Sequence, residues 1–164
     1  MNDDFEKGLA IFAEVYGPQM AEDCRKGAES GDDFNALHIK WSMELPFGQV
    51  WTREDQLSRR DRSLAVLGMC IGQRSFDEIK YHTIMGITNG LTRAEIEEVF
   101  FSAIPYCGLP AANTAKAAIQ EGFKALAKWA NCKAAEAPES DDYRLHHLQA
   151  DAKHCGLTVC PYRQ

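Results

Sequence analysis

Apolar side chains recur every three or four positions along most of the first 130 residues. This spacing is typical of helices that bury one face, and no stretch alternates apolar and polar residues for long enough to predict a strand. The residues that carry the pattern are Phe5, Leu9, Phe12 and Tyr16, then Phe34, Leu37, His38 and Trp41, then Leu64, Leu67 and Ile71, then Phe76, Ile79, Thr83 and Ile87, then Ile96, Val99, Phe100, Ala103 and Cys107, and finally Ile119, Phe123, Leu126 and Trp129. The sequence therefore predicts an all-α bundle of about six to eight helices.

Three helix starts follow one another in the middle of the chain, where a hydroxyl residue precedes a carboxylate by three positions. A hydroxyl there accepts from a free backbone N–H, and the carboxylate reaches back to the cap. Gly90 and Gly108 stand where two of these helices should end. The three pairs are Ser58 with Asp61, which fits least well because the motif takes Glu or Gln, Ser75 with Glu78, and Thr92 with Glu95. We expect three capped helices with His82 at their centre.

Two stretches lack both the regular apolar spacing and a helix-start motif. Residues 18–31 are polar and weakly periodic, and the run PFGQVWTRED at 46–55 is interpreted as an irregular loop. Trp51 in this loop either lines a pocket or anchors the loop to the core.

We expect one domain over residues 1–133, followed by a linker and C-terminal tail over residues 134–164.

Composition excludes several classes of function. The net charge of −6 and the pI of about 5.4 argue against nucleic acid as a partner. No apolar run approaches the roughly 18 residues that a membrane span needs. The N-terminal run MNDDFEKG lacks the basic and apolar regions of a signal peptide, which predicts a cytoplasmic protein.

The six cysteines are expected to be reduced, because the chain has no export signal and is long enough to bury a core. We interpret four of them as small hydrophobic side chains: Cys24, Cys70, Cys107 and Cys132. The tail combines histidine and cysteine but has no C-x-x-C pair, so no metal site is expected there. Its candidate ligands would be His146, His147, His154, Cys155 and Cys160.

Five segments form a recognisable set: GQVWTRED at 48–55, RRDRSLAVLGM at 59–69, DEIKYH at 77–82, NGLTRAEIEEV at 89–99 and IPYCGLPAANTA at 104–115. With their surroundings at 43–128 they resemble the carboxymuconolactone decarboxylase family. The last run, the W-T-R triplet and the histidine of I-K-x-H resemble its γ-carboxymuconolactone decarboxylase branch.

The resemblance implies the all-α AhpD-like fold, with protomers that interlock as obligate oligomers, either homotrimers or homohexamers. It also implies a lyase with no cofactor that removes CO2 from 4-carboxymuconolactone, a small carboxylic acid and lactone. At the family's histidine position, His82 becomes the expected general acid or base, since imidazole can donate a hydrogen bond and transfer a proton. A buried structural histidine is the alternative.

A neighbouring branch, which resembles the partner proteins of alkyl hydroperoxide reductase, uses C-x-x-C-x-x-x-H for thiol redox chemistry. When the two patterns are aligned on His82, its cysteines fall at Ser75 and Glu78. Neither residue can form a disulfide or a thiolate. Thiol redox activity is therefore not expected.

For each of the other candidate site residues, the sequence allows two interpretations of the side chain's role. Glu78 lies one helical turn earlier, where it either orients the imidazole or caps the helix at Ser75. Arg53 and Arg62 either bind a substrate carboxylate or lie on the surface. Tyr106, like Trp51, either walls the pocket or packs in the core. For the remaining arginines of this region we expect exposed positions: Arg59, Arg60 and Arg74.

One position departs from the branch pattern. An arginine usually follows the histidine by two residues, and this chain has Ile84 there. With Tyr81 beside it, Ile84 would make the substrate site more apolar. This favours an alternative in which the scaffold serves a larger or less charged, polyketide-like acid or lactone through decarboxylation, isomerisation or ring opening. A second alternative is an oligomeric protein that binds a small molecule without catalysis.

Overall fold

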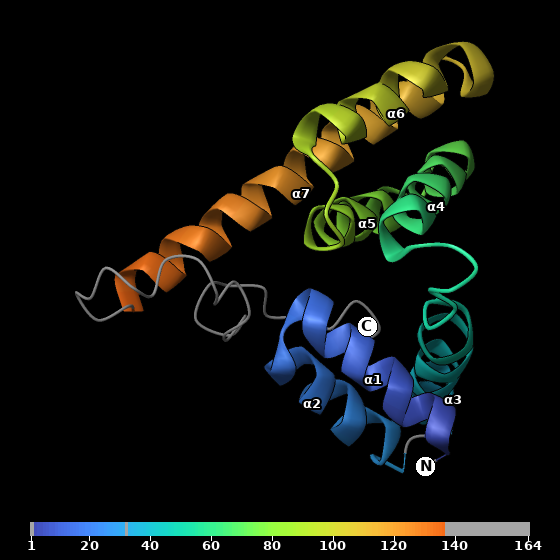
Figure 1. Ribbon diagram of the computed structural model, residues 1–164, viewed down its shortest axis with the longest axis vertical. Coiled ribbons are helices and arrows are strands. Elements are labelled where there is room, and N and C mark those ends of the chain that lie inside the picture. Colours follow the sequence, from blue (N-terminus) through green and yellow to red (C-terminus); the bar gives the residue numbers. More distant parts are fainter. Residues whose placement is uncertain (1, 32, 137–164) are drawn as a thin grey trace. The chain divides into compact units, whose positions relative to one another are not determined.

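The computed structural model describes residues 2–31 and 33–136, with side chains as far as Trp129. In this part of the chain there are seven α-helices, one π-helical segment and no strand. The prediction of an all-α fold is confirmed. In order, the elements are α1 (Asp3–Tyr16), α2 (Pro18–Ala28), α3 (Asp33–Ser42), η1 (Met43–Val50), α4 (Arg59–Gln73), α5 (Phe76–Thr88), α6 (Arg93–Cys107) and α7 (Leu109–Glu136) (Figure 1).

The chain divides into two compact units. One comprises Met1–Glu54 with the segment from Lys128, and the other comprises Asp55–Ala127. The first therefore holds α1, α2, α3 and η1, whereas the second holds α4, α5, α6 and α7 as far as Ala127. The predicted domain over 1–133 with a tail over 134–164 stays a prediction, and the tail histidines and cysteines lie outside the described residues.

Helix α2 is an element that the sequence analysis missed. Its residues are mostly polar, and only Met20, Ala21 and Cys24 are buried, so the apolar pattern is short. The start signal was present, because Pro18 occupies the first turn directly after Gly17, whose φ of 95° ends α1. Tertiary packing against α1 compensates for the weak pattern (Figure 1).

The segment 46–55 was expected to be an irregular loop. That expectation is wrong for residues 46–50, which belong to the π-helical η1, and correct for residues 51–55, which have no regular structure. Pro46 lies inside η1, where proline has no N–H to donate and its ring clashes with a preceding carbonyl in an ordinary α-helix. A wider turn accommodates both constraints. The segment is held by burial of Met43, Phe47 and Trp51, and the ring of Phe47 lies edge-on to Phe12 with centroids 5.2 Å apart.

Two glycines allow α1 to contact η1 at the backbone. A Cβ at Gly8 would lie 2.1 Å from the Met43 carbonyl oxygen, and a Cβ at Gly48 would lie 2.0 Å from the Asp4 carbonyl oxygen. Gln49 Nε2 also donates to Asp4 Oδ2 at 2.8 Å. Any side chain at either glycine would therefore force the two helices apart.

Helix α3 forms as predicted, but it exposes most of the predicted apolar face. Phe34 is 82% exposed and Trp41 is 63% exposed, whereas Ile39 on another face is 3% exposed. Leu37 and, in η1, Leu45 extend the exposed stripe. The first unit therefore buries the opposite side of α3 and leaves a large apolar surface uncovered within the described chain.

Two of the three predicted caps form. Ser58 Oγ accepts from the Asp61 N–H at 3.1 Å, and Thr92 forms a complete capping box with Glu95. Ser75 makes no side-chain cap, and its own N–H donates to the Cys70 carbonyl at 3.2 Å as part of the α4 terminus. Because that N–H is already used, the predicted pairing with Glu78 is wrong.

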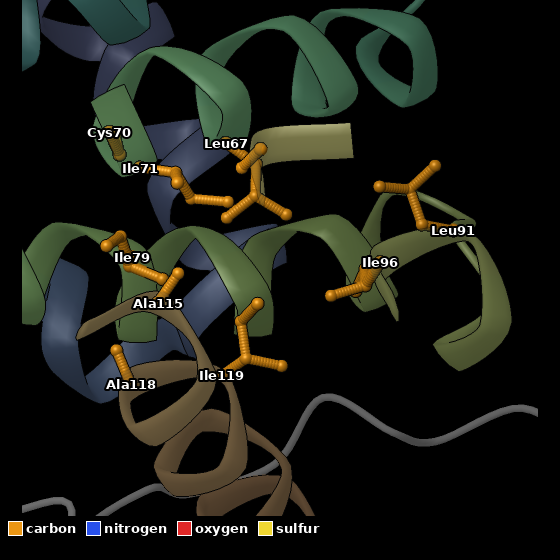
Figure 2. Close-up of a cluster of buried hydrophobic side chains, with 10 residues drawn as sticks. Leu67, Cys70, Ile71, Ile79, Leu91, Ile96, Ala115, Ala118 and Ile119 are labelled. Atoms are coloured by element: carbon orange, nitrogen blue, oxygen red, sulfur yellow. The ribbon is translucent and has the colours of Figure 1, made fainter. Parts of the chain in front are cut away.

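Side chains from four helices form the core of the second unit (Figure 2). Leu67 and Ile71 of α4 pack with Ile79 of α5, and all three are fully buried. Buried alanines of α7 let that helix approach closely. The remaining members of the cluster are Cys70, Leu91, Ile96, Ala103, Ala115, Ala118 and Ile119. Met69 of α4 is 63% exposed, so α4 buries the face that carries Leu67 and Ile71.

The described part of the chain holds three free cysteines, Cys24, Cys70 and Cys107, which agrees with the expected reduced state. It contains no group of three side chains arranged to hold a metal ion. None of its helices combines the length and apolar character that crossing a membrane requires.

We predict that Gly48→Ala lowers the free energy of unfolding by about 1–3 kcal/mol, because the added methyl group must displace the α1 backbone. Urea denaturation of the two proteins measures this difference. Gly68→Ala is the matched control, since no atom lies within 4 Å of its Cβ position in α4, and it should gain about 0.5–1 kcal/mol. Equal stability of Gly48→Ala and wild type would contradict the close contact.

Candidate active site

His82 lies near the middle of α5, on a turn that is fixed from both sides. Ile79 and Thr83 are fully buried, and Thr83 Oγ1 donates to the Ile79 carbonyl at 2.8 Å. On α7, a Cβ at Gly122 would lie 2.8 Å from Thr83 Cβ and 3.0 Å from the Lys80 carbonyl oxygen. Helix α7 therefore packs against the backbone that carries His82.

The His82 imidazole is mostly buried, with 15% of its side chain exposed. Burial lowers its pKa from 6.5 to about 4, because the charged form loses its hydration. The ring is therefore neutral near pH 7, with one nitrogen that can donate and one that can accept.

Glu78 lies one turn before His82, and its Oε2 is 3.8 Å from His82 Nε2. Half of the Glu78 side chain is exposed. Burial of the rest and, secondarily, the charge of Asp77 raise the pKa of this carboxyl above its ordinary value. Since the cap at Ser75 does not form, the structure favours the first of the two interpretations of Glu78, which is a carboxyl directed to the imidazole.

Cys70 is a neighbour of Glu78 that the sequence analysis did not place in the site. It lies on α4, is 8% exposed and has a pKa raised to about 11, first by burial and then by the charge of Glu78. At neutral pH it is therefore a thiol rather than a thiolate nucleophile. Only the packing of α4 on α5 brings it there, so no sequence signal could have identified it.

The other predicted residues of the second unit have different environments. Tyr81 is half-buried, and Lys80 Nζ lies 5.7 Å from its ring centroid. Arg62 is also half-buried, and its Nη2 donates to the Leu57 carbonyl at 3.3 Å. Ile84 is 1% exposed, whereas Tyr106 at the end of α6 is 90% exposed. Tyr106 is therefore not a core residue of the described chain.

Two predicted residues belong to the first unit. Trp51 is 3% exposed at the end of η1, which favours its interpretation as a core anchor. Arg53 is exposed two residues later.

Arg60 differs from the exposed arginine that we expected. It is half-buried and forms ion pairs with Asp61, at 3.2 Å, and with Glu95, so it joins α4 to α6. Arg74 is exposed as expected, with a positive φ of 59° where α4 ends.

Two surface grooves occur elsewhere on the described chain. One of about 290 Å³ lies between α1 and α2 and has Glu6 and Arg25 at its edge. Another of about 410 Å³ is lined by Arg93, Phe123 and neighbouring residues of α7. His82 and Glu78 line neither groove. The candidate active site is therefore defined by the two side chains on α5 and not by a groove.

Comparison with known proteins gives concordant matches. The model of the carboxymuconolactone decarboxylase family matches residues 38–121, which include the whole of α4, α5 and α6. The 4-carboxymuconolactone decarboxylase of Acinetobacter baylyi is 31% identical over 128 residues, which cover 77% of this chain and 92% of that protein. The nitrosuccinic acid decarboxylase of Metarhizium robertsii is 35% identical over 106 residues, which cover 65% of this chain and 71% of that protein.

We predict that burial of neutral His82 makes stability depend on pH. Between pH 6.5 and about 4 the unfolded histidine binds a proton that the folded one does not, so the free energy of unfolding falls as the pH falls. The contribution reaches about 3 kcal/mol at the acid end. Glu78, whose pKa is raised, contributes in the opposite direction. The measured quantity is therefore the difference between wild type and His82→Asn.

Urea denaturation at several pH values between 4.5 and 7.5 gives this difference. His82→Asn should lose the contribution, so its stability relative to wild type should improve as the pH falls. Lys116→Asn is the control, because Lys116 is exposed on α7, and it should follow wild type. Parallel pH profiles for His82→Asn and wild type would show that His82 is not held neutral by burial.

Proposed function

The chain belongs to the carboxymuconolactone decarboxylase family as a carboxy-lyase, and on that premise we propose that it removes CO2 from a small organic acid without a cofactor, with His82 acting on the reacting group of the substrate. The observation that carries the role of His82 is its place beside Glu78 on α5, buried and neutral. Two relatives named as decarboxylases support the reaction class.

The reaction needs little covalent help from the protein. When a carboxylate is attached to the saturated carbon next to a double bond that is conjugated with a lactone carbonyl, the electrons of the breaking C–C bond can flow through the double bond onto the carbonyl oxygen. The protein must bind the anion, stabilise the developing oxyanion and supply a proton to carbon. A neutral imidazole in a poorly hydrated position can donate a strong hydrogen bond to such an oxyanion.

We propose that Arg62, which is in the same unit as His82, binds the substrate anion, because a guanidinium group can hold a carboxylate through two hydrogen bonds. Arg53 is the other predicted arginine and is exposed in the first unit. Tyr81 and Tyr106 are proposed as apolar or hydrogen-bonding walls of the site. Trp51 is not included, because its burial at the end of η1 favours a core anchor.

A second candidate function keeps the scaffold and changes the acid. Ile84 replaces the arginine of the branch pattern and is buried, so it supplies no charge to a substrate. The relative from Metarhizium robertsii is named for nitrosuccinic acid rather than for a lactone. In such an acid a nitro group can accept the electrons of the departing carboxylate, as a lactone carbonyl does. The shared requirement is an electron-accepting group that is attached to, or linked through a double bond to, the carbon that loses the carboxylate.

The chain is proposed to act as a homotrimer or homohexamer. Support comes from the stripe of exposed apolar residues on α3 and η1, which is Phe34, Leu37, Trp41 and Leu45. Monomeric proteins rarely leave so many large apolar side chains together on the surface. An assembly would also explain why Tyr106 is 90% exposed in one chain and still serves a site.

We predict that the purified protein releases CO2 from 4-carboxymuconolactone or from nitrosuccinic acid, and that His82→Ala lowers kcat about 10²–10⁴-fold. Released CO2 is measured directly for each acid. Lys116→Ala, at an exposed position of α7 outside the proposed site, should retain wild-type activity. Undiminished turnover by His82→Ala would remove the histidine from the mechanism, and tight binding of both acids without turnover would favour a binding protein.

We predict that wild type has the mass of a trimer or hexamer in multi-angle light scattering, and that Trp41→Glu shifts it towards smaller species. A carboxylate buried in an apolar contact costs far more than one in water. Lys116→Glu, on an exposed position of α7, is the control and should leave the mass unchanged. A monomeric wild type, or a Trp41→Glu variant with unchanged mass, would contradict this use of the stripe.

A further inference from the structure

The proton that completes a decarboxylation must come from a group that can release it to carbon and regain it from water. His82 cannot store it as imidazolium near neutral pH, because burial keeps the ring neutral. A neutral imidazole donates hydrogen bonds readily but gives up its proton as an acid only with difficulty. His82 can therefore stabilise the oxyanion, but the group that gives the proton to carbon still has to be identified.

Glu78 has the position that the remaining task requires. Its Oε2 is 3.8 Å from His82 Nε2, so one bound ligand can contact both groups. It is also the more accessible of the two, since half of its side chain is exposed against 15% for His82. Solvent can therefore return a proton to Glu78 after each turnover. The Ser75 N–H, which would otherwise engage this carboxylate, donates to the Cys70 carbonyl instead.

We propose that Glu78 is the acid that protonates carbon, while neutral His82 donates a hydrogen bond to the oxyanion; this assignment rests on the proposed decarboxylation. The C–C bond to the carboxylate breaks, CO2 leaves, and its electron pair moves onto the conjugated oxygen. That pair then returns to form the new C–H bond with the proton of the Glu78 carboxyl. Water reprotonates the carboxylate, so atoms and electrons balance without an oxidant or reductant.

The groups that face Glu78 favour its protonated form. Asp77, its neighbour on α5, raises the pKa of the carboxyl, and Cys70 on α4 is an uncharged thiol near neutral pH. His82 adds no positive charge near neutral pH. Among the described residues no charged group of α6 or α7 contributes to the shift. A bound substrate anion would act in the same direction as Asp77, because like charges disfavour each other.

The first test is the pH dependence of kcat/KM for CO2 release by wild type, Glu78→Gln and Asp77→Asn. Wild type should lose activity on the alkaline side as Glu78 ionises. Glu78→Gln should be about 10²–10⁴-fold slower and should have lost that alkaline decline. Asp77→Asn should move the decline to lower pH and retain the plateau rate, because it removes a charge that raises the Glu78 pKa.

Different outcomes overturn the assignment. If Glu78 only orients His82, Glu78→Gln will be slower at every pH but will retain the alkaline decline. An unchanged profile in Asp77→Asn would equally show that the decline belongs to another group. Circular dichroism of each variant confirms that the helices are retained, and Asp77→Asn gives the answer even where Glu78→Gln does not fold.

A second measurement does not depend on turnover. The Glu78 carboxyl is titrated by carbon-13 NMR in wild type and in Asp77→Asn, with and without succinate as a dicarboxylate that does not react. Its pKa should exceed that of an ordinary glutamate, rise further with succinate and fall in Asp77→Asn. An ordinary value under all conditions would refute the proposal even if CO2 is released. A raised value in a protein that releases no CO2 would leave Glu78 as a proton store and refute the proposed reaction instead.

Discussion

Removal of His82 from water is the constraint on which the site depends. The ring is held on a helix whose neighbouring turns carry the fully buried Ile79 and Thr83, and α7 approaches that backbone through Gly122. A charged imidazole would lose its hydration there without a full countercharge, so the neutral form is favoured. Every chemical role for the residue must therefore be one that a neutral ring can perform.

Ser75 and Glu78 stand at the two positions that the sequence analysis compared with a C-x-x-C thiol motif. Glu78 is a carboxyl whose pKa is raised, first by burial, and the nearby Cys70 is held as a thiol by burial and by the charge of Glu78. The turn before His82 therefore presents a carboxyl and an imidazole instead of a pair of reactive thiols.

The two units bury their apolar residues unequally. The second unit collects side chains from four helices into one cluster, whereas the first leaves the stripe from Phe34 to Leu45 exposed along α3 and η1. Apolar area removed from water stabilises a protein by about 25 cal/mol per Å², so an exposed stripe of this kind represents stability that only a further contact could provide. It also shows that periodicity identifies an apolar face without identifying what covers that face.

The sequence by itself determined the helical class, the positions of α4, α5 and α6, and the prominence of His82, because local spacing and capping residues act over only a few positions. It also determined that Ser75 and Glu78 cannot perform thiol chemistry. It did not determine whether Ser75 and Glu78 form a cap, since that depends on the Ser75 N–H being taken by the end of the preceding helix. The π-helical path through Pro46 likewise depends on contacts from Gly8 and Gly48 to backbone atoms about 40 residues away. Only the tertiary structure decided that His82 is neutral, because hydration of a side chain depends on every segment packed around it.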